Sequence, residues 1–277
     1  MISLRCLPLA FVFLLAQSTK AAAPNFILIL ADDYGWTSLS TSMDQSKPAA
    51  KSDYYETPNL DSLVNNGMRF SNGYAAAPVC SPTRYSIQFG KTPARLLRTR
   101  VMGKNRADHN QTAIPQVLKA IDPTYRAAHF GKWHISADPS RYGYDAHDGQ
   151  TANKEGGFKN ERKAQWDGYS EDDPKRVHSI THRAIDFMRD AVAKKQPFFL
   201  QLSHYAVHSN IVYSESSYSA LNGKAKGKFH KDQGYAAMVH DMDLSIGDLL
   251  KAYEALGLAE NTYIIFTSDN GGMPVLP

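Results

Sequence analysis

Two short apolar runs in this chain end in side chains that could bind a metal ion. Asp32 and Asp33 follow the run 25–30, and Asp269 and Asn270 follow the run 262–267. In open α/β sheets, ligands bind outside the carboxyl ends of the strands, so neighbouring runs would bring four oxygen ligands together. Such hard ligands suit Ca²⁺, or Mg²⁺, and disfavour the softer transition metals. Each pair taken singly also fits a helix cap or a turn, because a glycine follows closely in both cases.

Cys80 is the next candidate for chemistry. The chain has 2 cysteines, and Cys6 lies in the segment 1–23, which has an early arginine, an apolar block and three alanines before Pro24. This pattern predicts a cleaved secretory signal peptide, which leaves Cys80 without a partner for an internal disulfide. Such a thiol is a buried filler, an intermolecular link or a chemically used group.

Basic and imidazole side chains follow two further predicted strands. Lys132 and His134 lie in a Gly-Lys-Trp-His turn after one strand, and His208 lies just beyond another. Taken alone, the Gly-Lys-Trp-His turn would be an ordinary surface turn after a strand. His178 and His182 have the spacing of metal ligands on a helix, but the mixed charges around them favour a solvated face.

The neighbours of Cys80 indicate how its thiol is used. The stretch 78–84 reads Pro-Val-Cys-Ser-Pro-Thr-Arg, and Gly90-Lys91 follows at the end of a predicted helix. Cys-x-Pro-Thr-Arg followed by Gly-Lys resembles the signature of type I sulfatases, the formylglycine-dependent family of the alkaline-phosphatase-like superfamily. Both acidic pairs and the Gly-Lys-Trp-His turn resemble further elements of that family, in the same order. Phe89 departs from the family pattern, which has a small hydroxyl residue before the glycine.

This resemblance implies a reaction and two cofactors. A formylglycine-generating maturation enzyme would oxidise Cys80 to formylglycine (3-oxoalanine), whose hydrate would supply the nucleophile that cleaves a sulfate ester. One divalent metal, Ca²⁺ with Mg²⁺ as the alternative, would bind beside it. Its ligands would be Asp32, Asp33, the modified Cys80, Asp269 and Asn270. The implied activity is a sulfuric ester hydrolase that releases sulfate from a sulfated carbohydrate or another sulfate ester.

The resemblance also implies the roles of the remaining site residues. Arg84 and Lys132 would hold the oxygens of the hydrate and of the sulfate group, and so stabilise the charge of the transition state. His134 would hydrogen-bond the hydrate and assist its deprotonation. His208 would protonate the leaving alkoxide, with His204 as a weaker rival.

The elements that must position these residues alternate between strand and helix. Helical patterns cover five segments, 57–66, 83–89, 113–121, 177–192 and 233–256. A short strand is predicted over 68–71, a mobile loop over 214–231, and a surface excursion that could shape a substrate cleft over 142–175. The alternation indicates an α/β fold. By resemblance, it is the alkaline-phosphatase-like three-layer sandwich with a largely parallel central sheet and a truncated C-terminal part.

Composition limits the class of protein. Of 277 residues, 43% are hydrophobic and 21% charged, which is globular composition. Removing Arg5 and Lys20 with the signal peptide takes the basic residues from 31 to 29, against 27 acidic ones. So small an excess gives no case for binding nucleic acid or a membrane surface, and no later segment is apolar enough to span a bilayer. We expect an exported protein, periplasmic or secreted, with a signal peptide at 1–23 and a catalytic domain at 24–277 that is incomplete at its C-terminus.

Two alternatives remain open. The same nucleophile and metal could attack phosphorus, which would make the chain a phosphate or phosphonate monoester hydrolase of the same superfamily. Sulfatases continue well beyond their second acidic pair, whereas this sequence ends at Pro277. The chain could therefore also be a truncated, inactive relative that binds sulfated glycans without cleaving them.

Overall fold

The computed structural model describes residues 22–101, 110–161 and 165–272. The predicted signal peptide, 1–23, lies outside the described residues except for its last two, so it stays a prediction. Within the described ranges, no helix combines the length and the apolarity that crossing a membrane requires.

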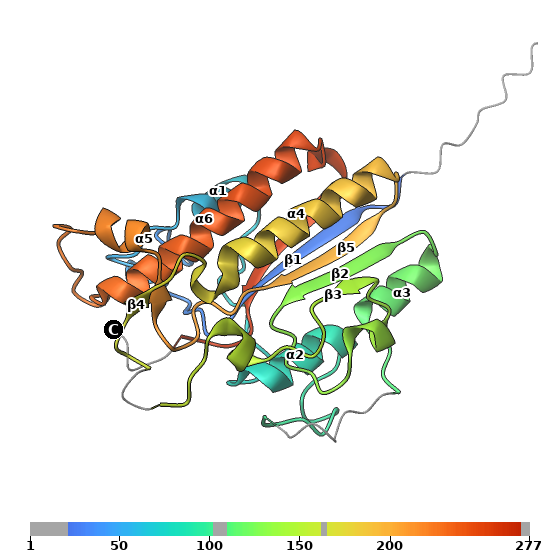
Figure 1. The fold of residues 1–277 in the computed structure, drawn as a ribbon, viewed down its shortest axis with the longest axis horizontal. Helices are drawn as coiled ribbons and strands as arrows, with labels where there is room; N and C mark the ends of the chain where they lie inside the picture. The colour runs from blue at the N-terminus through green and yellow to red at the C-terminus, as the bar shows by residue number, and fades with distance from the viewer. Residues whose placement is uncertain (1–21, 102–109, 162–164, 273–277) are drawn as a thin grey trace, which may run out of the picture.

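A five-stranded sheet forms the centre of the molecule, in the order β3–β2–β5–β1–β7 (Figure 1). The strands are β1 (Asn25–Ala31), β2 (Arg126–Gly131), β3 (Ala146–His147), β5 (Phe198–Ser203) and β7 (Thr262–Ser268). All except β3 are runs that the sequence predicted as strands. Every pair of neighbours is parallel, so the carboxyl ends of the four longer strands meet at one edge of the sheet.

Helices cover both faces of this sheet (Figure 1). One face carries α1 (Pro58–Asn66), α4 (Val177–Ala193) and α6 (Gln233–Ala255), and the other carries α2 (Cys80–Phe89) and α3 (Ile114–Ile121). Because successive strand residues point to opposite faces, Ile27 and Ile29 join the core under α4 and α6, whereas Leu28 joins the core under α2. The predicted three-layer α/β sandwich with a parallel central sheet is confirmed.

Short elements fill the connections. A second, two-stranded sheet pairs β4 (Tyr169–Ser170) with β6 (Val212–Tyr213), and α5 (Glu215–Ala220) follows it. The 3₁₀ helices are η1 (Pro139–Tyr142), η2 (Asn153–Gly156), η3 (Pro174–Arg176) and η4 (Ala259–Asn261). Three of these turns lie in the excursion predicted over 142–175 or at its ends.

Two predictions of local structure were wrong. Residues 68–71 form no strand, and Met68 and Phe70 are 79% and 70% exposed, so no packed surface holds an extended segment there. The loop predicted over 214–231 contains α5, because the Ser214 hydroxyl accepts a hydrogen bond from a main-chain amide of its first turn.

The helix that carries the cysteine signature begins at Cys80 rather than at Thr83. Pro82 is tolerated in this first turn, where its missing amide hydrogen would have no helical partner. Gly90 ends the helix in the left-handed conformation, as expected for a glycine in that position. This start places Cys80 at the N-terminal end of α2 and Arg84 one turn further along.

Candidate active site

The ends of β1 and β7 bring the two predicted metal-binding pairs together. The strands are parallel neighbours with Ala31 opposite Ser268, so the acidic pairs that follow leave the sheet side by side. The main-chain amide of Asp33 donates to Asp269 Oδ1 at 3.3 Å, and the side-chain amide of Asn270 donates to Asp33 Oδ1 at 2.5 Å. Residues far apart in the sequence therefore form one cluster of oxygens.

This cluster has the chemistry of a site for a hard cation. Asp32 Oδ1 and Asn270 Oδ1 are buried without a hydrogen-bond partner. Ligand atoms of Asp32, Cys80 and Asp269 lie within 4.8 Å of one another, and all three residues are buried. Burial and the charge of Asp32 raise the pKa of the Asp269 carboxyl, against the opposing charge of Arg84. Since unpaired buried oxygens are unfavourable, the donor set fits a divalent ion such as Ca²⁺ or Mg²⁺.

Cys80 lies beside this cluster at the start of α2. It is 8% exposed, and its Sγ lies 3.2 Å from Nδ1 of His134. Burial raises the pKa of the Cys80 thiol, and the opposing charge of Lys132 offsets only part of that effect. The unmodified side chain is therefore a protonated thiol at neutral pH, which is a poor nucleophile.

Arg84 joins the ends of three strands. It is 2% exposed, and its Nε donates to Asp269 Oδ2 at 2.8 Å, while Nη2 lies 3.6 Å from Asp32 Oδ1. Its Nη1 donates to the main-chain carbonyl of Lys132. A planar guanidinium can make these contacts at the same time, which a point charge cannot.

Lys132 and His134 follow β2, where the chain turns at Gly131. Lys132 is fully buried, and its Nζ donates to Asp32 Oδ2. Gly131 has φ +95°, and a Cβ there would lie 1.9 Å from the carbonyl oxygen of Ser203, so the turn requires glycine. Burial and the charge of Lys132 lower the pKa of His134 to about 3, so its imidazole is neutral at physiological pH. The turn is thus part of the interior, not an ordinary surface turn.

His208 faces Asp33, of the first acidic pair, from the loop after β5. Its Nε2 lies 3.8 Å from Asp33 Oδ2 and 3.2 Å from the amide nitrogen of Asn153. Its Nδ1 lies 2.7 Å from the carbonyl oxygen of Ser209, and Phe158 packs edge-on against the ring at 5.1 Å. A carbonyl oxygen only accepts, so Nδ1 carries a hydrogen and Nε2 is the nitrogen that faces the site.

His204, the weaker rival, is buried away from these contacts. It is fully buried, and neither of its ring nitrogens has a hydrogen-bond partner. Burial lowers the pKa of His204 to about 3. The geometry therefore favours His208 for any role at the metal pair.

Sequence reasoning missed two residues near this centre. Asn153 contacts His208 from the start of η2, where no sequence pattern marks a functional position. Lys175 is 3% exposed, and the charges that act on it include Asp32 and Lys132. A lysine just before a helix is ordinarily a surface residue, so its sequence context gave no signal.

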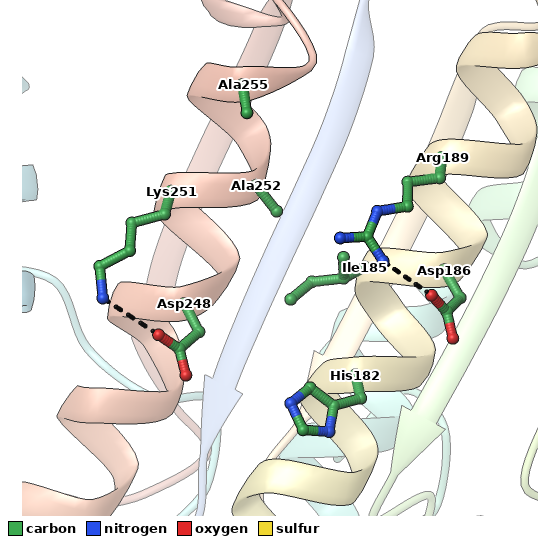
Figure 2. A pocket seen from close by; sticks show the side chains of 8 residues that line it. All are labelled: His182, Ile185, Asp186, Arg189, Asp248, Lys251, Ala252 and Ala255. Carbon is green, nitrogen blue, oxygen red and sulfur yellow. Dashed lines mark hydrogen bonds and ion pairs between the residues drawn. The ribbon is translucent and has the colours of Figure 1, made fainter.

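A separate groove of about 640 Å³ lies between α4 and α6 (Figure 2). Two ion pairs within the helices line it, Arg189 with Asp186 at 3.1 Å and Lys251 with Asp248 at 3.1 Å. His182 also lines it and is exposed. This exposure agrees with the interpretation of His182 as part of a solvated face.

Curated relatives of the chain are sulfatases. It is 29% identical over 280 residues to N-acetylgalactosamine-6-sulfatase of Mus musculus, with 90% of this chain and 50% of that protein covered. It is 28% identical over 294 residues to arylsulfatase G of Canis lupus familiaris, covering 91% and 51%. A sulfatase of Formosa agariphila is 29% identical over 338 residues, covering 94% and 60%. The chain thus spans 50% to 60% of the length of these relatives.

Solved structures share the fold. Ps i-CgsB superposes with a TM-score of 0.74 at 26% identity, covering 92% of this chain and 60% of that one. The PsFucS1 sulfatase from Pseudoalteromonas sp. superposes with a TM-score of 0.66 at 21% identity, covering 90% and 55%. The prediction of an alkaline-phosphatase-like fold is confirmed by these neighbours. Because the sulfatase family model also matches residues 24–274, with both acidic pairs and Cys80 inside the match, this chain belongs to the sulfatase family.

Proposed function

We propose that this chain carries the catalytic site of a sulfuric ester hydrolase that releases sulfate from a sulfated carbohydrate. The observation that carries the proposal is the convergence of Cys80 with Arg84, His134 and the Asp32 and Asp269 carboxylates at one edge of the sheet. A nucleophile position, fixed cations and metal ligands within reach of one another are the parts that sulfate-ester cleavage needs. Family membership supports the reaction class.

Two groups would complete the site. Position 80, oxidised to formylglycine by a maturation enzyme, would supply an oxygen nucleophile and a second hydroxyl as the hydrate of its aldehyde. A divalent ion, Ca²⁺ or Mg²⁺, would supply positive charge against the sulfate oxygens. Asp32, Asp33, Asp269 and Asn270 would hold that ion together with position 80. The unpaired buried oxygens of Asp32 and Asn270 support this ligand set.

Arg84 and Lys132 would hold the sulfate group. Both side chains are buried, and their contacts with Asp269 and Asp32 fix them in place before any substrate binds. Charges that are already oriented stabilise the negative charge of a transition state without reorganising. This preorganisation supports their assignment as transition-state cations.

Two histidines would move protons. His134 is neutral because burial holds its pKa near 3, and its Nδ1 is within 3.2 Å of the side chain at position 80, so it can accept a proton there. As an imidazolium, with a hydrogen on Nε2 as well as on Nδ1, His208 would donate the Nε2 hydrogen to the oxygen of the leaving alcohol. Its Nδ1, held by the Ser209 carbonyl, fixes the ring for this transfer.

The relatives support a carbohydrate substrate. One is named N-acetylgalactosamine-6-sulfatase, and Ps i-CgsB was solved in complex with k-i-k-neocarrahexaose. The first name points to a sugar that carries the ester, and the second to an oligosaccharide ligand. We therefore place a sulfated carbohydrate first among the substrates to be tested.

Export belongs to the same proposal. The segment 1–23 has the composition of a signal peptide, and export would carry the mature chain to the periplasm or the exterior. Sequencing the N-terminus of the exported chain should give Pro24 as the first residue. Recovery only in the cytosol, with Met1 retained, would contradict export.

Expression with and without a formylglycine-generating enzyme tests the function. Mass spectrometry of the peptide that contains position 80 should show the aldehyde, and the matured chain should release sulfate from an aryl sulfate and a sulfated N-acetylgalactosamine. Cys80→Ala should abolish release. An unmodified thiol, in cells that mature a control sulfatase, would exclude the formylglycine mechanism. Faster turnover of an aryl phosphate would favour a phosphate hydrolase, and glycan binding without turnover an inactive relative.

A further inference from the structure

Lys175 occupies an unfavourable position just before α4. It lies in η3 and is 3% exposed, and both it and Arg176 adopt left-handed backbone conformations, with φ +53° and +56°. Such conformations are unfavourable for residues with a Cβ. An ammonium at the N-terminal end of a helix is also opposed by the helix dipole, and burial removes its hydration. Nothing in the local structure therefore favours a lysine here.

The ammonium of Lys175 has no partner among the described residues. Its Nζ makes no hydrogen bond or ion pair. Solvent still reaches this nitrogen, because it is not among the fully buried side-chain atoms that lack a partner. Other half-buried lysines find main-chain oxygens. Lys119 donates to the Gly143 carbonyl and Lys224 to the Tyr54 carbonyl, each at 2.7 Å. Lys175 thus keeps its donors free at an opening to solvent.

The charges that act on Lys175 include those of the candidate active site. They belong to Asp32, Lys132, Glu171 and Asp33, of which Asp32 acts most strongly. Burial lowers the pKa of the Lys175 ammonium to about 7, and the three carboxylates oppose that effect. The ammonium therefore lies within electrostatic range of Asp32 and Asp33.

Among the described cations that act at this centre, Lys175 makes no ion pair with a carboxylate. Arg84 donates to Asp269, and Lys132 donates to Asp32, so both of these cations are already paired in the substrate-free chain. A buried cation without a protein partner can donate its hydrogen bonds to an anion that binds in the site. Such charge-assisted hydrogen bonds are strong.

We propose that Lys175 is an anion-binding residue of this centre, whose ammonium contacts the sulfate group of the ester and the released sulfate ion. The proposal rests on the proposed function, because it adds a residue to the same site. Its free donors and its burial carry it, and the charge of Asp32 that acts on it supports its place at this site. Lys175 would then contribute to ground-state binding and to product retention.

Calorimetric titration of the calcium-loaded chain with sodium sulfate tests this contact without turnover. Lys175→Met keeps the length of the side chain but removes its charge, so the sulfate Kd should rise about tenfold or more. Lys175→Arg should keep most of the affinity. Lys195→Met is the matched control, because Lys195 is exposed just past the other end of α4 and also has φ +53°. It should leave the Kd unchanged.

Thermal melting checks that each variant is folded, and Lys175→Gln supplies a second neutral side chain if the methionine variant does not fold. In the matured enzyme, the neutral variants should raise KM for an aryl sulfate and Ki for sulfate together, with a smaller change in kcat.

Two results would overturn the proposal. One is an unchanged sulfate Kd in a folded neutral variant, even if turnover falls, and the other is no measurable sulfate binding by the unaltered chain. Weaker sulfate binding in Lys175→Met, in a chain that turns over no ester, would leave the anion-binding role standing and reject the proposed function instead.

Discussion

Buried charges hold one another in place at the centre of this molecule. Asp32, Asp33 and Asp269 bring three carboxylates to the strand ends, and the paired cations Arg84 and Lys132 balance only two of them. Asp32 keeps an oxygen without a hydrogen-bond partner despite these contacts. The remaining negative charge is what a divalent ion would neutralise.

Arg84→Lys should lower kcat about 100-fold or more in the matured enzyme, a loss comparable to removing one transition-state donor. Lysine keeps the charge but cannot contact Asp269, Asp32 and the Lys132 carbonyl together. Steady-state turnover of an aryl sulfate measures the effect. The exposed Arg95→Lys serves as the control and should keep its activity. A loss smaller than about fivefold in Arg84→Lys would show that charge alone is sufficient there.

The residues of the candidate site could be predicted where they follow a recognisable pattern. Asp32 and Asp269 end apolar strands, and Cys80 carries Pro82 and Arg84 at fixed offsets, so local sequence marks all of them. Lys175 carries no such mark, because its position depends on a left-handed turn and on packing against distant segments. Asn153 carries no such mark either, because its contact with His208 joins segments far apart in the sequence.

At the scale of elements, the parallel sheet does the positioning. The metal pairs, the Lys132 turn and the loop of His208 all leave the carboxyl ends of adjacent strands, and α2 adds Cys80 and Arg84 from one side. Strands such as β1 could be predicted because burial on both faces requires a continuous apolar run. The segment 68–71 has strand-like composition but no neighbouring strand or core contact in the described structure. Composition alone therefore predicted a strand that does not form.

Gly131→Ala should destabilise the fold by about 3 kcal/mol or more, because left-handed strain adds to a clash with β5. The new Cβ would lie 1.9 Å from the Ser203 carbonyl oxygen, so β2 must move and carry Lys132 away from Asp32. Urea unfolding measures the stability, and turnover should be lost with it.

Gly90→Ala is the matched control for this change. Gly90 has φ +60° but nothing within 4 Å of an added Cβ, so backbone strain alone should cost about 1–2 kcal/mol. If both variants lost the same stability, the close approach of β2 to β5 would not be what requires glycine at position 131.

Across the whole molecule, buried histidines link stability to pH. Burial lowers the pKa of His129, His134 and His204 from 6.5 to about 3. Below pH 6.5 the unfolded chain binds protons that the folded chain does not, so the free energy of unfolding falls as the pH drops toward 3. Each histidine contributes a slope of up to about 1.4 kcal/mol per pH unit in that window.

His204→Gln removes one of these groups without touching the proposed machinery. Its stability, measured by urea unfolding in EDTA between about pH 7.5 and pH 5, should fall less steeply than that of the unaltered chain. An equal slope in both chains would mean that His204 does not remain neutral in the folded state.

Metal binding should stabilise the whole chain, because its ligands join β1 and β7 at opposite ends of the sequence. At a Ca²⁺ concentration about 100 times the Kd, the free energy of unfolding should rise by about 2.7 kcal/mol, with a matching rise in Tm that EDTA reverses. Asp269→Asn removes one charged ligand and should lose most of this shift, whereas the exposed Asp172→Asn should keep it. A Tm indifferent to Ca²⁺ and Mg²⁺ would leave the buried carboxylates without the cation that their burial requires. A larger shift with Zn²⁺ would instead point to the Cys80 thiol as the dominant ligand, since soft sulfur prefers that ion.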